Sequence, residues 1–231
     1  MQHEPSSLLA TAEVIHWVAL AVMAVVYTTR LMWLFSFKAG RDRSAPAAPE
    51  RTNARKGGLY SLGNVVMPWS MESTRTGPLF YTSFVIFHLG VTAGISLAFL
   101  SSLAPGFVRT PVVAWTFGVL LATAFVVGVL RMARRLTKPY MRLISTPDDY
   151  FSLGLLTVWF LLGALTQASI GGFAPLAGEG WLAAYLLLTA FFLLYVPFSK
   201  ISHYLYYPFT RLWIGRALGH RGSLPLVRVR G

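Results

Sequence analysis

Two of the chain's five histidines, His88 and His203, lie in apolar segments long enough to cross a membrane. No carboxylate lies at their depth in these segments. An imidazole in hydrocarbon is unfavourable unless a partner satisfies its ring nitrogens. A buried histidine on each of two helices therefore predicts a metal or cofactor shared between them.

The composition indicates an integral membrane protein. Hydrophobic residues make up 55% of the chain and charged residues 12%, with a mean hydropathy of +0.57. The chain has no cysteine, which excludes a disulfide, a thiolate zinc site and a cysteine-ligated iron–sulfur cluster within this polypeptide. Any such cluster must belong to a partner subunit.

Five segments approach the length of about 20 apolar residues that a membrane helix needs. They are residues 14–37, 78–100, 111–130, 151–168 and 181–213. Helices are expected because lipid offers no hydrogen bonds to backbone groups. The sequence thus predicts one all-α membrane domain over residues 1–231, a bundle of five transmembrane helices. The fifth segment is longer than a span needs, so we expect it to emerge into the cytoplasm, with a kink at Pro197.

Basic residues predict the orientation, because cytoplasmic loops accumulate lysine and arginine. They gather in the loop at residues 38–77, after the third segment and after the fifth, whereas the opposite side has little but Arg109. The amino terminus should therefore lie outside and the carboxyl terminus in the cytoplasm. On this interpretation the net charge of +12 reflects topology, and no nucleic-acid partner is expected.

His88 is expected deep in the second segment. It follows Pro78 by ten residues, which at about 1.5 Å per residue is roughly 15 Å of helix. Its neighbours at helical spacing form an apolar wall that suits a flat macrocycle: Phe84, Val85, Val91, Thr92 and Ile95. Taken alone, His88 is equally explained by a hydrogen bond to a hydroxyl or carbonyl group of a neighbouring helix.

His203 precedes Trp213, the expected end of the fifth segment, by ten residues, so it should reach a similar depth from the cytoplasmic face. A six-coordinate haem needs one neutral nitrogen on each side of its iron, and facing helices supply such a pair. We therefore expect haem b as the cofactor, with His88 and His203 as iron ligands. Lys200, Arg211 and Arg75 lie on the side suited to the haem propionates, although each is equally explained as an ordinary basic flank.

Other features of the sequence give weaker indications of structure or function. His16, beside Trp17 near the outer end of the first segment, is a reserve candidate for a cofactor role. Residues 59–69 are apolar and aromatic but too short to span, which fits an interfacial segment or a docking surface for another subunit. The Gly90 and Gly94 spacing favours close helix packing, and Asp148 and Asp149 favour a cap of the fourth helix.

The chain resembles the cytochrome b membrane subunits typified by the nitrate reductase gamma subunit, a group that includes similar subunits of sulfite-reduction-associated and heterodisulfide-reductase-like complexes. The resemblance covers roughly residues 14–219. Beyond the five-span layout, it rests on Phe87-His88-Leu89-Gly90, on Arg134-Arg135-Leu136 leading through Pro139 and Arg142 to Thr146 and Asp149, and on Val196-Pro197-Phe198-Ser199-Lys200 leading to His203 and Pro208. Members of this group usually pass electrons between a quinone pool and a cytoplasmic iron–sulfur partner.

Two departures from the group are informative. Members with two haems carry a further histidine on the second helix and another on the fifth, where this chain has Ala98 and Tyr185. The resemblance therefore implies that the outer haem is absent and that the inner haem, held by His88 and His203, is kept. A quinone site near the outer haem becomes doubtful, and quinone is expected near the inner face.

These observations predict a multi-pass subunit of the cell inner (cytoplasmic) membrane. It would carry electrons between menaquinone or ubiquinone and cytoplasmic or membrane-associated iron–sulfur or other redox subunits of a respiratory complex, surrounded by membrane lipids. The alternative is a structural anchor for soluble redox subunits, with haem in a non-catalytic role or absent. A transporter is a weaker third option, because the spans lack the buried carboxylates of ion coupling.

Overall fold

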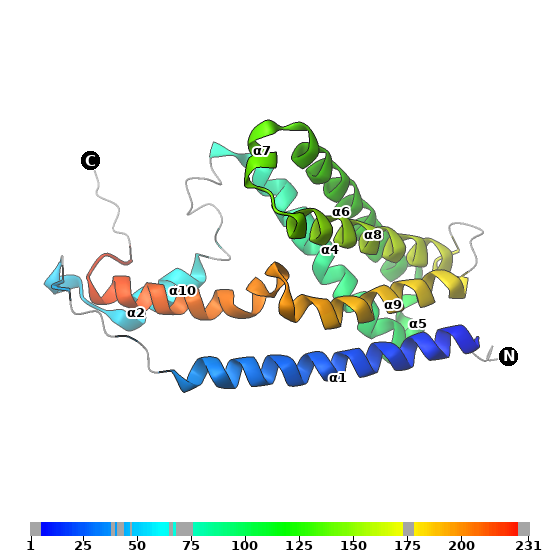
Figure 1. Cartoon of the computed structure of the whole chain (residues 1–231), viewed down its shortest axis with the longest axis horizontal. Coiled ribbons are helices and arrows are strands. Elements are labelled where there is room, and N and C mark those ends of the chain that lie inside the picture. The colour runs from blue at the N-terminus through cyan, green and yellow to red at the C-terminus, as the bar shows by residue number, and fades with distance from the viewer. Residues whose placement is uncertain are drawn as a thin grey trace. The chain divides into compact units, whose positions relative to one another are not determined.

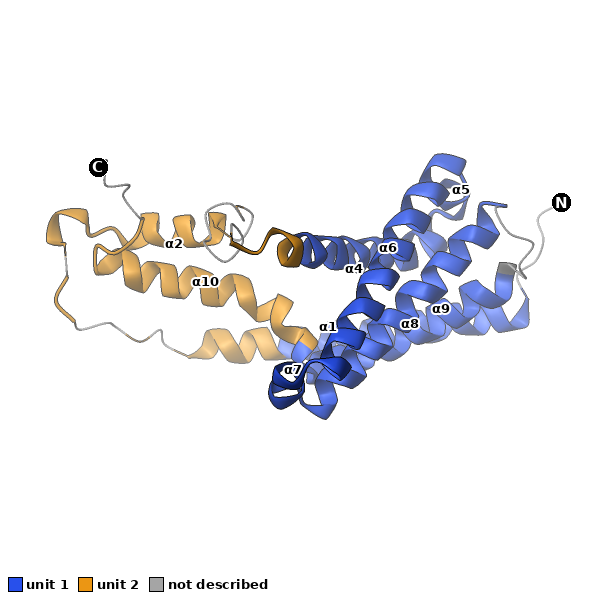
Figure 2. Cartoon of the chain, turned by 90° about the horizontal axis from the view of Figure 1, so that it is seen from above, with its two compact units in different colours: residues 1–29, 82–200 blue, residues 30–81, 201–231 orange. Residues whose placement is uncertain are grey.

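The computed structural model describes residues 6–37, 40, 44–46, 48–64, 67, 76–172 and 178–225. Over these residues the chain forms helices and no strand. It divides into two compact units, which Figure 2 shows in different colours. Unit 1 comprises residues 1–29 and 82–200, and unit 2 comprises residues 30–81 and 201–231. The single membrane domain expected for residues 1–231 stays a prediction.

Among the described residues, five helices are long and apolar enough to cross a membrane. The candidate spans are α1 (Ser7–Ser36), α4 (Pro78–Leu103), α6 (Pro111–Thr137), α8 (Pro147–Ile170) and Glu179–Phe198, which contains most of α9 (Gly178–Tyr195). The prediction of an all-helical fold with five helices long and apolar enough to span a membrane is thereby confirmed for the described residues. The first four helices are longer than the predicted apolar ranges, because helical hydrogen bonding continues into flanking polar residues.

Local sequence explains where the spanning helices begin. Proline occupies the first turn of α6 and of α8, where its missing N–H removes no helical hydrogen bond. The start of α8 also has a capping box, in which Thr146 and Asp149 satisfy each other's backbone N–H groups. The predicted capping role of Asp149 is therefore confirmed. Two short helices, α5 (Pro105–Val108) and α7 (Pro139–Ile144), lie in the connections before and after α6.

Unit 1 is packed through glycines. A Cβ atom on Gly90 would collide with Ala124 of α6, and one on Gly94 would collide with the indole of Trp159 of α8. These two glycines therefore let the neighbouring helices approach α4 closely, as their spacing predicted. Helix α8 also packs against α6 and α9, and Figure 1 shows α8 and α9 running side by side.

The fifth predicted segment differs from the prediction. Residues 181–213 do not form one kinked helix, because α9 ends at Tyr195 and two 3-10 turns follow, η3 (Val196–Phe198) and η4 (Lys200–Ser202). A new helix, α10 (His203–His220), begins after them. The physical reason is that Pro197 has no backbone N–H and that Ser199 takes an extended conformation, with φ −104° and ψ 172°.

Unit 2 contains a closely packed helix pair. Helix α2 (Ala54–Gly63) lies along α10, as Figure 1 and Figure 2 both show. A Cβ atom on Gly57 would collide with the backbone of Gly215 and Gly219, so the two helices meet backbone to backbone. The predicted loop at residues 38–77 therefore contains a helix. Of the apolar stretch at 59–69, residues 59–63 belong to α2, while 65, 66, 68 and 69 lie outside the described residues.

Candidate functional site

His88 lies on the outward face of α4 in unit 1. Phe87 and Gly90 on the same helix are buried, whereas His88 is exposed on the surface of the unit. Its Nδ1 atom lies 2.7 Å from the carbonyl oxygen of Phe84. Because a carbonyl oxygen can only accept, Nδ1 must donate, and the neutral ring then carries its lone pair on Nε2. Histidines that ligate metals through Nε2 are commonly oriented in this way.

An aromatic and apolar surface surrounds the His88 ring. The ring of Phe84 lies against the imidazole with a centroid distance of 3.9 Å. One turn further along α4, the hydroxyl of Thr92 donates to the backbone carbonyl of His88, and Ile95 is 48% exposed. The wall expected around His88 is therefore present on one helix face, with a single hydroxyl group that is occupied by its own helix.

Arg131 of α6 is a cation that contacts Phe87, the buried neighbour of His88 in the sequence. Its guanidinium carbon lies 4.8 Å from the centroid of the Phe87 ring, within the range of a cation–π interaction. Among the described side chains, no carboxylate forms an ion pair with Arg131. From the sequence, Arg131 was one of the basic residues that follow the third apolar segment, and no site role was predicted for it. The available signal was its position, one helical turn deeper than Arg134 and Arg135.

His203 is the first residue of α10 and is exposed in unit 2. It lies five residues beyond Phe198, where the fifth candidate span ends. The depth expected for His203 assumed an unbroken helix to Trp213, and the break between α9 and α10 removes that assumption. Since His88 belongs to unit 1 and His203 to unit 2, the pairing of the two imidazoles stays a prediction.

The three cations expected to hold propionates differ in their surroundings. The Lys200 ammonium donates to the hydroxyl of Thr146 at 2.7 Å and forms a 3.2 Å ion pair with Asp149. Arg211 donates weakly to the carbonyl of Ser61 at 3.4 Å, and its buried Nε has no acceptor among the described residues. Arg75 lies outside the described residues. Arg211 therefore has unused hydrogen-bonding capacity, whereas Lys200 already joins η4 to α8.

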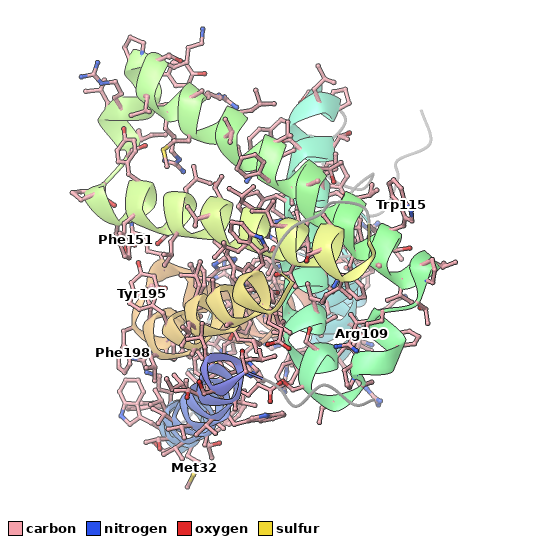
Figure 3. The ribbon with its side chains drawn as sticks, turned by 90° about the vertical axis from the view of Figure 1, so that its right-hand side faces the viewer. Met32, Arg109, Trp115, Phe151, Tyr195 and Phe198 are labelled. Carbon is pink, nitrogen blue, oxygen red and sulfur yellow. The ribbon has the colours of Figure 1, made fainter. Side chains whose placement is uncertain are left out.

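A second polar contact joins α8 to α9. The hydroxyl of Tyr195 donates to the carboxylate of Asp148 at 2.6 Å and lies 2.9 Å from the hydroxyl of Ser152. The rings of Tyr195 and Phe151 are 5.4 Å apart, and Figure 3 shows both with Phe198 along one side of unit 1. Asp148, expected only as a helix cap, therefore also links two helices. Its partner Tyr195 was missed because the two residues are 47 positions apart in sequence.

Ala98 and Tyr185, the two positions at which the resemblance implied the loss of an outer haem, are buried in unit 1. They are 1% and 0% exposed. The Tyr185 hydroxyl donates to the carbonyl of Gly94 at 2.5 Å. The indole of Trp159 stacks on Tyr185 at 5.7 Å and donates to Thr189 at 2.8 Å. Side chains that contact each other directly thus occupy this region.

His16 of α1 is more buried than its sequence position suggested. The residue is 1% exposed, and its ring lies 5.7 Å from that of Trp17 and 6.1 Å from that of Phe99 on α4. Its Nδ1 has no hydrogen-bonding partner among the described residues. The sequence did not predict this burial, because α1 has no distinct polar face that would show which side of the helix is buried.

Side chains that could form a multidentate metal site do not gather in the part of the chain that the structure describes, where no group of three or more histidines and carboxylates occurs. An iron porphyrin has a different requirement, because the macrocycle supplies four nitrogens and the protein supplies at most two ligands. The sequence predicts His88 and His203 for these two ligands, and that assignment stays a prediction.

The chain is similar to a known protein over most of its length. A protein of Nitratidesulfovibrio vulgaris (strain Hildenborough) is 25% identical over 203 residues, which cover 86% of this chain and 88% of the relative. The name of that relative states no activity. No protein-family model and no solved structure matches the chain.

Proposed function

We propose that this chain is a haem b-containing membrane subunit that transfers electrons between a quinone pool and iron–sulfur or other redox subunits of a respiratory complex. The supporting observation is the His88 imidazole, whose Nδ1 donates to the carbonyl of Phe84 and leaves the lone pair on Nε2. Haem supplies one-electron chemistry, while the protein binds it, orients it and tunes its potential.

The residues of α4 and α6 fit such a group in unit 1. His88 would supply one iron ligand, and the apolar face of Phe84 and Ile95 would contact the macrocycle. Arg131 adds a positive charge near the ligand and favours a reduced or anionic group there. His203 is the proposed second ligand. Arg211 suits a propionate better than Lys200 does, because its Nε lacks an acceptor among the described residues.

The proposal includes one haem per chain. The Trp159–Tyr185 stack occupies the core around Gly94, where two-haem members of the resembled group would need space and a histidine on each helix. This packing supports the loss of the outer haem.

The proposed membrane is the cell inner membrane, with the amino terminus outside and the carboxyl terminus in the cytoplasm. The reason is that lysine and arginine gather in the loop after α1, in the last turns of α6 and just beyond it, and after α9.

Ligand substitution tests the proposal. Full-length protein with His88→Ala, with His203→Ala and, as a control, with His220→Ala should be purified and its reduced-minus-oxidised spectrum recorded. We expect the b-type signal to be lost or strongly shifted in the first two variants and kept in the third. A pyridine haemochrome assay should give one haem per wild-type chain. An unchanged signal in both the His88 and His203 variants would refute the ligand pair, and a preparation without haem would refute the cofactor.

A structural anchor is the second candidate, and the position of His203 favours it. This residue lies beyond the end of the fifth candidate span, in a unit whose helices α2 and α10 are not candidate spans. Such a unit is suited to contacts outside the membrane. The two functions differ kinetically: if a quinol analogue reduces the haem and a quinone-site inhibitor stops the reduction, the anchor function alone is insufficient.

A further inference from the structure

Positive charge is concentrated in unit 2. This unit holds thirteen of the chain's 20 lysines and arginines but three of its eight acidic residues, a net charge of +10 out of +12. Among its described side chains, one ion pair forms, between Glu50 and Arg51 at 3.7 Å. The three acidic residues of this unit are too few to neutralise its thirteen basic residues.

The packing of α2 on α10 determines which residues of α2 face outward. Gly57, Gly58 and Ser61 are buried against α10. Arg55 and Lys56 on the same helix are exposed, and Leu59 is 59% exposed. Because the contact is made by backbone atoms, α2 cannot rotate its cationic face toward α10 without a collision. Two cations and an apolar side chain are thus held on one outward surface.

A cavity of about 330 Å³ lies at this surface. It is lined by Asn53, Arg55, Lys56, Leu59, Tyr60 and Pro225, all within unit 2. Neither Arg55 nor Lys56 forms an ion pair with a described residue. Leu59 and Pro225 add apolar lining to the same cavity as the two cations, so it matches a ligand that joins an anionic head to an apolar body.

The position of unit 2 in the sequence brings it near a membrane surface. Helix α10 begins at His203, five residues after the fifth candidate span ends at Phe198. Its outward side chains include Tyr204, Tyr207 and Trp213, which are about half exposed and belong to the types enriched at membrane interfaces. Juxtamembrane segments rich in lysine and arginine are attracted to anionic lipid surfaces.

We propose that the cavity lined by Arg55, Lys56 and Leu59 binds the headgroup of an anionic phospholipid. The guanidinium and ammonium groups contact the phosphate, and Leu59 with Pro225 contacts the glycerol and the start of an acyl chain. Inorganic phosphate can bind the two cations but has no apolar part to contact Leu59 and Pro225. A zwitterionic lipid carries a positive charge of its own, which the two cations repel. The assignment is independent of the proposed haem.

Native mass spectrometry of the detergent-solubilised full-length chain tests this site. The chain is titrated with phosphatidylglycerol, with phosphatidylcholine and with inorganic phosphate. Arg55→Gln/Lys56→Gln should weaken phosphatidylglycerol binding roughly tenfold to thirtyfold, as expected for two lost charges of about a factor of five each. Leu59→Ser should weaken binding of the lipid but not of phosphate. The matched control, Lys138→Gln/Arg142→Gln, removes two exposed basic residues of unit 1 and should bind as the wild type does.

Three results would overturn the site. One is equal phosphatidylglycerol affinity in the Arg55/Lys56 variant and the wild type. Another is an equal loss in the Lys138/Arg142 control, which would indicate nonspecific charge attraction. The third is inorganic phosphate binding as tightly as phosphatidylglycerol, which would assign the cavity to a free anion. Circular dichroism of each variant verifies that its helices are retained.

Discussion

In both units glycines bring helices together, but the atoms that pack against the glycine differ. In unit 1, Gly94 makes room for the large indole of Trp159, which itself stacks on Tyr185. In unit 2, Gly57 makes room for the backbone of Gly215 and Gly219. The first contact buries an aromatic side chain, whereas the second depends on the close approach of two helix backbones. The same residue type thus supports a packed core in one unit and a thin, charged helix pair in the other.

The two units also differ in net charge. Unit 1 carries seven basic and five acidic residues, and unit 2 carries thirteen and three. Unit 1 contains most of the candidate spans, where unpaired charge is unfavourable. In α2, Gly57, Gly58 and Ser61 are buried against α10, whereas Arg55 and Lys56 stay exposed. A close glycine contact is therefore compatible with a strongly cationic surface.

The largest effect is expected from truncating the aromatic core of unit 1. Trp159→Ala removes a 3% exposed indole that stacks on Tyr185 and donates to Thr189. It should lower the free energy of unfolding by about 3–5 kcal/mol, measured by denaturation in detergent micelles. Trp213→Ala, which removes a 54% exposed indole from unit 2, is the control and should change stability by less than about 1 kcal/mol. Equal losses in the two variants would contradict the contrast between the units.

An intermediate effect is expected at the backbone contact of unit 2. Gly57→Ala places a methyl group against the backbone of Gly215 and Gly219, which cannot move aside as a side chain would. The variant should separate α2 from α10 at a cost of about 1–3 kcal/mol and expose α2 to trypsin at Arg55 and Lys56.

Gly63→Ala provides the matched control for that variant, because nothing lies within 4 Å of the added methyl group. Its cleavage by trypsin should match that of the wild type. If Gly57→Ala is cleaved no faster than Gly63→Ala, the backbone contact between α2 and α10 is not what protects α2.

The smallest effect is expected from a single hydroxyl group in unit 1. Tyr185→Phe removes the hydrogen bond to the Gly94 carbonyl but keeps the stack on Trp159. Stability should fall by about 0.5–1.5 kcal/mol in the same denaturation assay. Tyr207→Phe, at an exposed position of unit 2, should be neutral. A loss as large as that of Trp159→Ala would mean that the hydrogen bond, rather than aromatic packing, dominates this core.

Several features of the fold could be predicted because their causes are local. Apolar runs of sufficient length indicated the five candidate spans, and Asp148 with Asp149 indicated a cap at the start of the fourth of them, α8. The fifth segment was harder. Pro197 is compatible with a kinked helix and with a broken one, and the choice depends on the extended conformation of Ser199 and on the contact of Lys200 with α8. The predicted depth of His203 depended on that choice.

The contacts at the candidate site likewise include one that is local in sequence and one that is not. The hydrogen bond of His88 to Phe84 spans four residues of one helix, so it follows from local geometry. The approach of Arg131 to Phe87 does not, because it joins two helices and depends on how α6 packs. The haem, the pairing of His88 with His203, the quinone and the redox partners are predictions that the spectra and assays described above test.

The sequence by itself determined the all-helical, apolar character of the chain, its five candidate spans and the starts of α4 and α6, because apolar content and prolines act over a few residues. Only the tertiary structure decided which partner each glycine admits, that His16 is buried, and that Tyr195 meets Asp148. The physical reason is that these contacts join residues distant in sequence, and close packing selects among many local conformations that the sequence alone permits.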